Sequence, residues 1–218
     1  MKTKLFAGVA AAAVLAASAV SAQTMATAST DLNVRAGPGP HYEVVGVIGV
    51  DQQAEILGCL EASQWCEVTY AGGQGWAYSD YLIADYEGVE AVVTERRAEI
   101  GVPVVEYRSS GGGALAGGAT GAVAGALIGG PVGAAVGAVA GAATGGITEG
   151  VLAPEARTYV VENPVEPVYL EGEVVVGAQV PETVEVREIP NYEYRYVYVN
   201  QQPVIVEPDT RRIVYIVR

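Results

Sequence analysis

The sequence has 218 residues, of which 25 are Asp or Glu and 12 are Lys or Arg, giving a formal net charge of −13. Phosphate backbones bind to cationic surfaces, so this balance argues against nucleic acid as a partner. The length suits one or two modest domains, and two shifts in composition along the chain favour two.

The first 22 residues have the composition of an export signal. Lys2 and Lys4 precede an uncharged apolar run over Leu5–Val20, and small residues up to Ala22 provide a cleavage site. A retained membrane helix is the alternative, but the run is short and no basic flank follows it. We therefore expect residues 1–22 to be removed and the protein to reside in the periplasm, or in the outer membrane and cell envelope.

Residues 23–84 predict a small β-barrel, because short β-prone runs alternate there with Gly- and Pro-rich turns. Cys59 and Cys66 are the only cysteines. An even pair in an exported chain predicts one disulfide, here between neighbouring strands. Two free thiols are the alternative.

Three motifs of this region resemble, in order, those of the bacterial Src-homology 3 domains. They are LNVRAGPG at Leu32–Gly39, WCEV at Trp65–Val68 and GWAYSDYL at Gly75–Leu82. The resemblance implies a small β-barrel that binds cell-wall peptides, peptidoglycan or partner proteins and has no catalytic activity of its own.

Aromatic side chains are the candidates for a ligand surface, because rigid rings supply binding area at low entropic cost. The candidates are Tyr42, Trp76, Tyr78 and Tyr81. The alternative for Trp65 and Trp76 is a place in the core, since large side chains dominate small cores.

Residues 85–110 predict an acidic linker, and residues 111–147 form an uncharged Gly/Ala-rich segment. Nine glycines recur there at every fourth position, which on a helix leaves a stripe where another helix can pack closely. They are Gly113, Gly117, Gly121, Gly125, Gly129, Gly133, Gly137, Gly141 and Gly145. Pro131 interrupts the repeat near its midpoint, which predicts a helical hairpin.

This segment resembles the glycine zippers of small Gram-negative outer-membrane proteins. Glycine costs about 1 kcal/mol per helical position relative to alanine, so the hairpin requires something to pack against. Membrane insertion and association with further copies in a homo-oligomer both meet that need. A flexible Gly/Ala linker is the third alternative.

Residues 148–172 predict a Pro/Glu linker, and residues 173–218 a small antiparallel β-rich domain. The expected strands are Glu173–Val176, Thr183–Val186, Tyr192–Val199, Val204–Glu207 and Arg211–Val217. Four alternating tyrosines share one face of the third strand, either as a binding platform or as the cover of a small core. They are Tyr192, Tyr194, Tyr196 and Tyr198.

Three stretches of this domain resemble the exported proteobacterial family called domain of unknown function 1236. They are Gly177–Pro181, Ile189–Pro190 and Val204–Val214. Glu207 stands where that family has an aspartate, a departure from its pattern. The resemblance implies architecture and compartment, and no activity.

An enzyme is the first functional alternative, and its chemistry needs a nucleophile with a base or a set of metal ligands. His41 is the only histidine and lies in a Pro-His-Tyr turn, and both cysteines are expected in the disulfide. Paired carboxylates remain open as acid and base.

The sequence thus predicts a mainly β, non-enzymatic envelope protein: an SH3-like barrel, a Gly/Ala-rich helical hairpin and a C-terminal β-rich domain. We expect the barrel to bind peptidoglycan or an envelope protein, and the glycine segment to associate with a membrane or with further copies. No catalytic residue, metal site or cofactor is expected. A soluble periplasmic adaptor with a Gly/Ala hinge is the alternative, and a cell-wall-modifying enzyme or its accessory subunit a weaker one.

Overall fold

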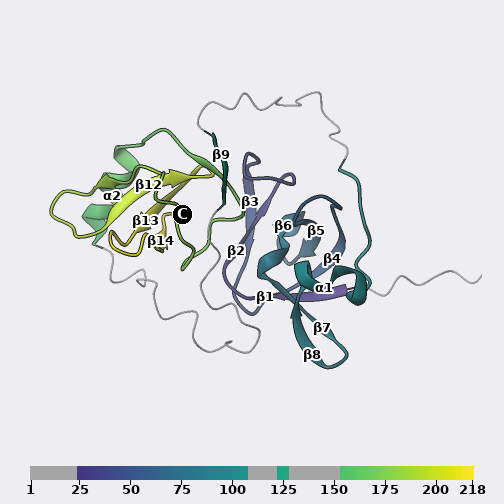
Figure 1. Ribbon diagram of the computed structural model, residues 1–218. Coiled ribbons are helices and arrows are strands. Elements are labelled where there is room, and N and C mark those ends of the chain that lie inside the picture. Colours follow the sequence, from purple (N-terminus) through teal and green to yellow (C-terminus); the bar gives the residue numbers. More distant parts are fainter. Residues whose placement is uncertain (1–23, 108–121, 128–152) are drawn as a thin grey trace, which may run out of the picture.

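The computed structural model describes residues 24–107 and 153–218, together with the backbone of residues 122–127 (Figure 1). The expected export signal at 1–22 lies outside these residues, and so does every zipper glycine except Gly125. The described residues form the two predicted β-rich domains, and the mainly β fold class is confirmed.

The N-terminal domain is one curled antiparallel sheet with the strand order β3-β2-β6-β5-β4-β1-β7-β8. Leu32, Val34, Val68 and Leu82 are fully buried in its core. The strands are β1 (Thr24–Ala28), β2 (Leu32–Arg35), β3 (Val44–Ile48), β4 (Gln53–Cys59), β5 (Trp65–Tyr70), β6 (Gly73–Tyr78), β7 (Leu82–Tyr86) and β8 (Val89–Val92). A 3₁₀ turn, η1 (Ser79–Tyr81), joins β6 to β7.

Strands β2 and β6 approach each other closely at Gly75. A Cβ atom at Gly75 would lie 2.5 Å from Cγ1 of Val34 and 2.8 Å from the carbonyl oxygen of Arg35. Since neither neighbour can move without disturbing the sheet, the glycine is required for Arg35 to pair with Trp76 across the two strands. The first and last motifs of the barrel are therefore adjacent in space.

Residues 85–107 are structured, in contrast to the acidic linker predicted over 85–110. They complete the β7–β8 hairpin, form helix α1 (Val93–Ile100), and end in a stretch that lies along β4. In that stretch the Cys59 amide donates to the Pro103 carbonyl at 2.8 Å, and the Val105 amide donates to the Cys59 carbonyl at 3.0 Å. The linker was predicted because this segment is rich in charged residues. In the structure most of these side chains face solvent, whereas Val92 and Val93 are buried.

The C-terminal domain is an antiparallel meander, as predicted, with the order β11-β12-β13-β14. Its elements are α2 (Pro154–Glu162), β10 (Tyr169–Glu171), β11 (Arg187–Glu188), β12 (Arg195–Val199), β13 (Gln202–Val206) and β14 (Ile213–Ile216). The predicted strands at Glu173–Val176 and Thr183–Val186 are instead irregular chain, and α2 and β10 lie in the predicted linker 148–172. These segments were predicted as strands because they are rich in valine. In the structure several of these valines are buried in the core cluster without forming strands.

Helix α2 covers one face of the meander, the face that carries the tyrosines. The hydroxyl of Tyr196 donates to the carbonyl oxygen of Asn163 at 2.9 Å, and that of Tyr198 to the carbonyl oxygen of Val160 at 3.0 Å. These two tyrosines therefore cover a small core, the second of the two alternatives, and bond to the helix backbone. Tyr192 and Tyr194 precede β12 and are half-buried.

The backbone of Ala122–Leu127 forms strand β9, parallel to β10, where the glycine repeat predicted a helix. The helix prediction is therefore wrong for these six residues. The rest of 111–147 lies outside the described part of the chain. The physical reason is the weak helix propensity of glycine, which lets pairing with a neighbouring strand decide the backbone conformation.

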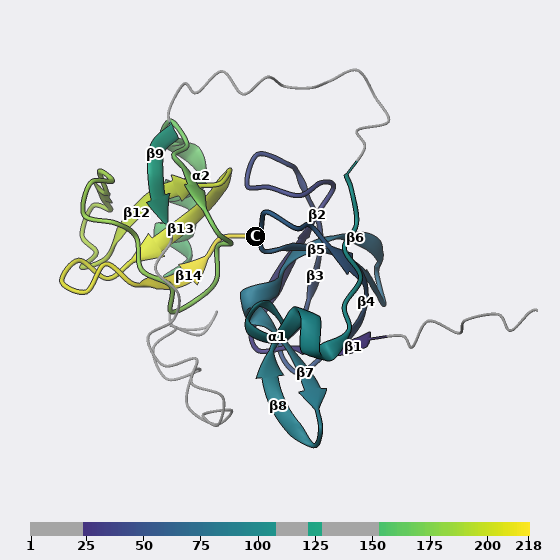
Figure 2. The same cartoon turned by 45° about the vertical axis from the view of Figure 1, so that its right-hand side comes forward.

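The two domains lie side by side (Figure 2). They share one buried apolar cluster. Leu32 and Val34 of the barrel belong to it, as do Val197 and Val204 from the face of the meander opposite α2. Within the described residues, neither α1 nor α2 has the length and apolar character to span a bilayer.

Candidate functional site

Arg35 and Glu173 form an ion pair between the two domains. The guanidinium Nε donates to Oε2 of Glu173 at 2.5 Å and Nη2 donates to Oε1 at 2.7 Å, so the pair is bidentate. Neither side chain is exposed to solvent. The remaining guanidinium nitrogen, Nη1, donates to the carbonyl oxygens of Pro40 and Tyr42. Bidentate geometry and complete pairing are the conditions under which a buried ion pair is tolerated.

Asn33, two residues earlier on the same face of β2, joins this network. Its Nδ2 donates to Oε1 of Glu173 at 3.1 Å and to Oε1 of Gln202 at 2.9 Å. The Val174 amide donates to the same Glu173 oxygen at 2.8 Å. The polar side chains of the LNVR motif are thus bound to the C-terminal domain, which removes this face of the barrel from the surface.

His41 lies at the rim of the same interface. Its ring stacks on Tyr169, with ring centroids 4.2 Å apart and an interplanar angle of 29°. Its carbonyl oxygen accepts a hydrogen bond from Nε2 of Gln201 at 3.0 Å. The only histidine of the chain therefore takes part in a contact between the domains.

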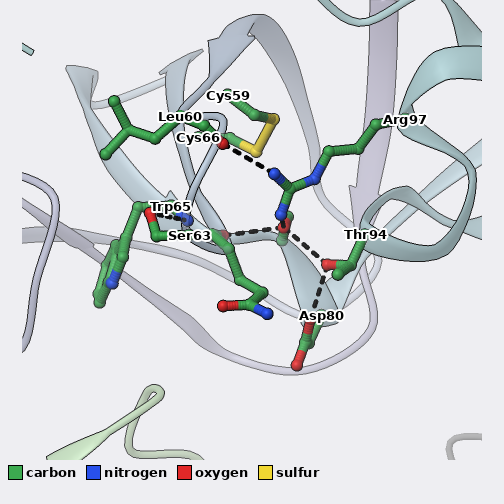
Figure 3. The surroundings of a disulfide bond; sticks show 10 residues. Cys59, Leu60, Ser63, Trp65, Cys66, Asp80, Thr94 and Arg97 are labelled. Atoms are coloured by element: carbon green, nitrogen blue, oxygen red, sulfur yellow. Dashed lines mark hydrogen bonds between the residues drawn. A yellow bond between two sulfur atoms is a disulfide. The ribbon is translucent and has the colours of Figure 1, made fainter. Parts of the chain in front are cut away.

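The predicted disulfide Cys59–Cys66 is present, and it joins directly opposed residues of β4 and β5 (Figure 3). Arg97 of α1 reaches the same turn and donates from Nη1 to the Leu60 carbonyl at 2.9 Å. Thr94 of α1 donates to Asp80 at 2.6 Å. The disulfide and α1 together fix the β4–β5 turn to the end of β6.

The predicted ligand residues fall into two groups. Tyr78 and Tyr81 are buried and lie with Trp65 in an aromatic cluster, in which the rings of Trp65 and Tyr78 meet edge to face at 5.3 Å. Burial, followed by the charge of Asp80, raises the pKa of Tyr78 to about 12, and the same two causes raise the pKa of Tyr81 further. Such hydroxyls stay protonated, and the rings serve as core.

Tyr42 and Trp76 lie around Tyr107, which the sequence analysis did not select. The ring of Tyr107 meets Trp76 at 5.4 Å and Tyr42 at 5.8 Å, both edge to face. Burial, and then a hydrogen bond with Tyr107, raises the pKa of Tyr42. Trp76 is only 5% exposed, so both tryptophans are core residues, although one side of Trp76 still meets a pocket.

That pocket is open, has a volume of about 730 Å³, and lies over β5, β6 and the stretch after α1. Besides Trp76 and Tyr107, it is lined by Glu67, Gln74 and Glu106. Glu106 and Tyr107 were missed because they lie in the predicted linker. The β-prone run Val102–Val105 was a sequence signal that this stretch is structured, because such residues are typical of strands and not of linkers.

No group of three or more His, Cys, Asp or Glu side chains in residues 24–107 or 153–218 is arranged to hold a metal ion. The described lining of the pocket presents carboxylates, an amide and aromatic side chains.

Comparison with known proteins supports both resemblances. Residues 30–83 match the family described as Bacterial SH3 domain, and residues 159–218 match the Domain of unknown function (DUF1236). The chain is also 34% identical over 62 residues to the Bacillus subtilis (strain 168) protein named "Putative N-acetylmuramoyl-L-alanine amidase YrvJ". That stretch spans 28% of this chain and only 12% of the relative. The chain thus contains a bacterial SH3 domain followed by a DUF1236 domain.

Proposed function

We propose that this is a non-enzymatic, exported cell-envelope protein whose SH3 domain binds the cell wall. The observation that carries the proposal is the bacterial SH3 match at residues 30–83. The similarity to a protein named for cleaving a cell-wall amide bond supports the same ligand class. The disulfide between the only two cysteines fits an oxidising compartment outside the cytoplasm.

The non-enzymatic part of the proposal rests on where the usual catalytic side chains lie. Both cysteines are in the disulfide, and His41 is engaged in a ring stack at the domain interface. Nucleophilic catalysis commonly pairs a Ser or Cys with a histidine base, and here the histidine and both thiols have structural roles.

A sedimentation assay with purified sacculi tests the proposal. The protein without residues 1–22 is expected to sediment with the sacculi and to leave their turbidity unchanged over hours. Protein that stays in the supernatant would remove the wall-binding function. Falling turbidity with release of soluble fragments would show that the protein is an enzyme.

We further propose that the glycine repeat tethers the protein to a membrane or to further copies of itself. The glycines at every fourth residue from Gly129 to Gly145, which lie after strand β9, support this, because such spacing promotes close helix packing in lipid. Fractionation of cells expressing Gly137→Leu, with Ala138→Leu as a neighbour off the repeat, tests it. The tether predicts a membrane pool or oligomer that only Gly137→Leu reduces. A protein wholly soluble and monomeric in every form would instead be an adaptor with a hinge.

A further inference from the structure

Residues 103–107, which follow helix α1, lie along the barrel as a strap (Figure 2). Two backbone hydrogen bonds with Cys59, one on each side of Val104, make the strap a parallel neighbour of β4. In the described part of the chain, β1 pairs with β4 as far as Ile56, and the strap is the neighbour of β4 at Cys59. The strap is thus bound through main-chain groups, as a peptide added to a strand edge is.

The side chains of the strap alternate between the barrel and solvent, as those of a bound peptide strand do. Val105 and Tyr107 are partly buried against the core cluster, whereas Val104 is 68% exposed. Val105 lies over Gly58, where a Cβ atom would clash with Cγ1 of Val105 and would lie 2.9 Å from the carbonyl oxygen of Pro103. Glycine at this position of β4 therefore leaves the room that the strap occupies.

Gly58 begins a row of paired residues that lies under the strap. Gly58 pairs with Glu67, and Glu67 pairs with Trp76. Directly paired residues point to the same side of a sheet. At the far end of this row the ring of Tyr107 meets Trp76 at 5.4 Å and Tyr42 at 5.8 Å. The strap thus reaches from β4 to two aromatic residues that were predicted as ligand contacts.

The strap lies outside residues 30–83, the part that matches the Bacterial SH3 domain family. Its backbone is joined to β4 by the two hydrogen bonds with Cys59, and three of its five residues are exposed. Segments held by few backbone hydrogen bonds open locally at a lower cost in free energy than global unfolding. The strap can therefore leave β4 while the sheet of the barrel stays intact.

We propose that the strap is an intramolecular ligand of the SH3 barrel, and that an extended peptide of the cell wall binds by displacing it from β4 and Trp76. The inference rests on the proposed wall binding, and it names the ligand class and the step that controls access. A site that is open in a small fraction of molecules has an apparent affinity lowered by that fraction. The strap therefore sets the affinity for the wall.

Loosening the strap tests the inference, with binding to sacculi as the measurement. Val105→Ser removes the side chain over Gly58, and Val104→Ser, the same change on the exposed side of the strap, is the matched control. With the site open in about a tenth of wild-type molecules or fewer, Val105→Ser is expected to bind about tenfold more tightly. Val104→Ser is expected to bind as the wild type does.

Tyr107→Ser loosens the other end of the strap, at Trp76, and is expected to give a similar gain, provided that urea transitions show each variant to be folded. Unchanged or weaker binding by both strap variants would overturn the inference and leave wall binding intact. No binding by the wild type or by any variant would overturn both.

A synthetic peptide with the sequence of residues 102–107 gives an independent arm. Because Tyr107 meets Trp76, tryptophan fluorescence of the full chain reports its uptake. Val105→Ser is expected to show a saturable change with this peptide and none with a peptide that has serine at positions 105 and 107. Adding Gly58→Ala blocks the edge of β4 and should abolish the response. No response in Val105→Ser, or an equal one after Gly58→Ala, would show that this is not a peptide site.

Discussion

The pairing of Arg35 with Glu173 joins residues 138 positions apart and removes both charges from water. A buried ion pair contributes little net stability, but loss of one partner leaves the other charge uncompensated. Glu173→Gln keeps the shape and is expected to lower the free energy of unfolding by about 3–5 kcal/mol. Urea denaturation measures this, with Glu185→Gln in the exposed pair with Arg187 as control. Equal losses in the two variants would mean that Glu173 does not neutralise Arg35.

Tyr78 makes stability depend on alkaline pH. Its pKa in the fold is about 12, against about 10 for an unfolded tyrosine, so the folded state holds the proton more tightly. That contribution is complete below pH 10 and is lost as pH rises from about 10 to about 12. The urea midpoint should therefore fall across this range, and fall less in Tyr78→Phe, which has no proton to lose. Parallel curves for the two proteins would contradict the assignment.

At the scale of elements, the β4–β5 turn is fixed twice, by the disulfide and by Arg97. The two cysteines are seven positions apart, and closing so short a loop stabilises the fold by about 2.5 kcal/mol in the chain-entropy estimate. The double variant Cys59→Ala with Cys66→Ala should lose about that amount in urea denaturation. Reductant should destabilise the wild type to the same level and leave the variant unaffected. A variant as stable as the oxidised protein would show that the turn needs no covalent link.

The elements that could be predicted are those whose signals are local. Gly, Pro and other turn residues between short β-prone runs marked the barrel strands and β12 to β14, and alternating tyrosines also marked β12. Helix α1 was not predicted, because most of its side chains are charged or polar and its apolar side is short. Val93, its buried residue, packs against the barrel only in the folded structure. The segment Glu173–Val176 was predicted to be a strand. Instead, the Val174 amide donates to Oε1 of Glu173, and Nδ2 of Asn33 in β2 donates to that Glu173 oxygen and to the Val174 carbonyl.

The candidate site could be predicted only in part for the same reason. Trp76 and Tyr42 were selected as aromatic candidates for a ligand surface, but their partner Tyr107 comes from a stretch that composition assigned to a linker. Nothing in a local window shows that residues 102–105 lie along β4, because the evidence is a pair of backbone hydrogen bonds with Cys59. Residue type indicated the chemistry, and tertiary contacts determined which residues share the pocket.

At the scale of the whole molecule, the two domains share a buried cluster and the Arg35–Glu173 network, so we expect them to unfold as one cooperative unit. Ile205 tests this, since it is fully buried between the meander and α2, in the cluster separate from the barrel. Ile205→Ala is expected to cost about 2–5 kcal/mol.

The only tryptophans, Trp65 and Trp76, report on the barrel, whereas far-ultraviolet circular dichroism reports on the whole chain. If the two domains unfold as one cooperative unit, Ile205→Ala shifts both urea transitions to the same lower midpoint, because a loss of stability in one domain destabilises the other. Ile205→Val is then expected to shift both transitions by a smaller amount. An unchanged fluorescence transition beside a split dichroism curve would show two independently folding modules.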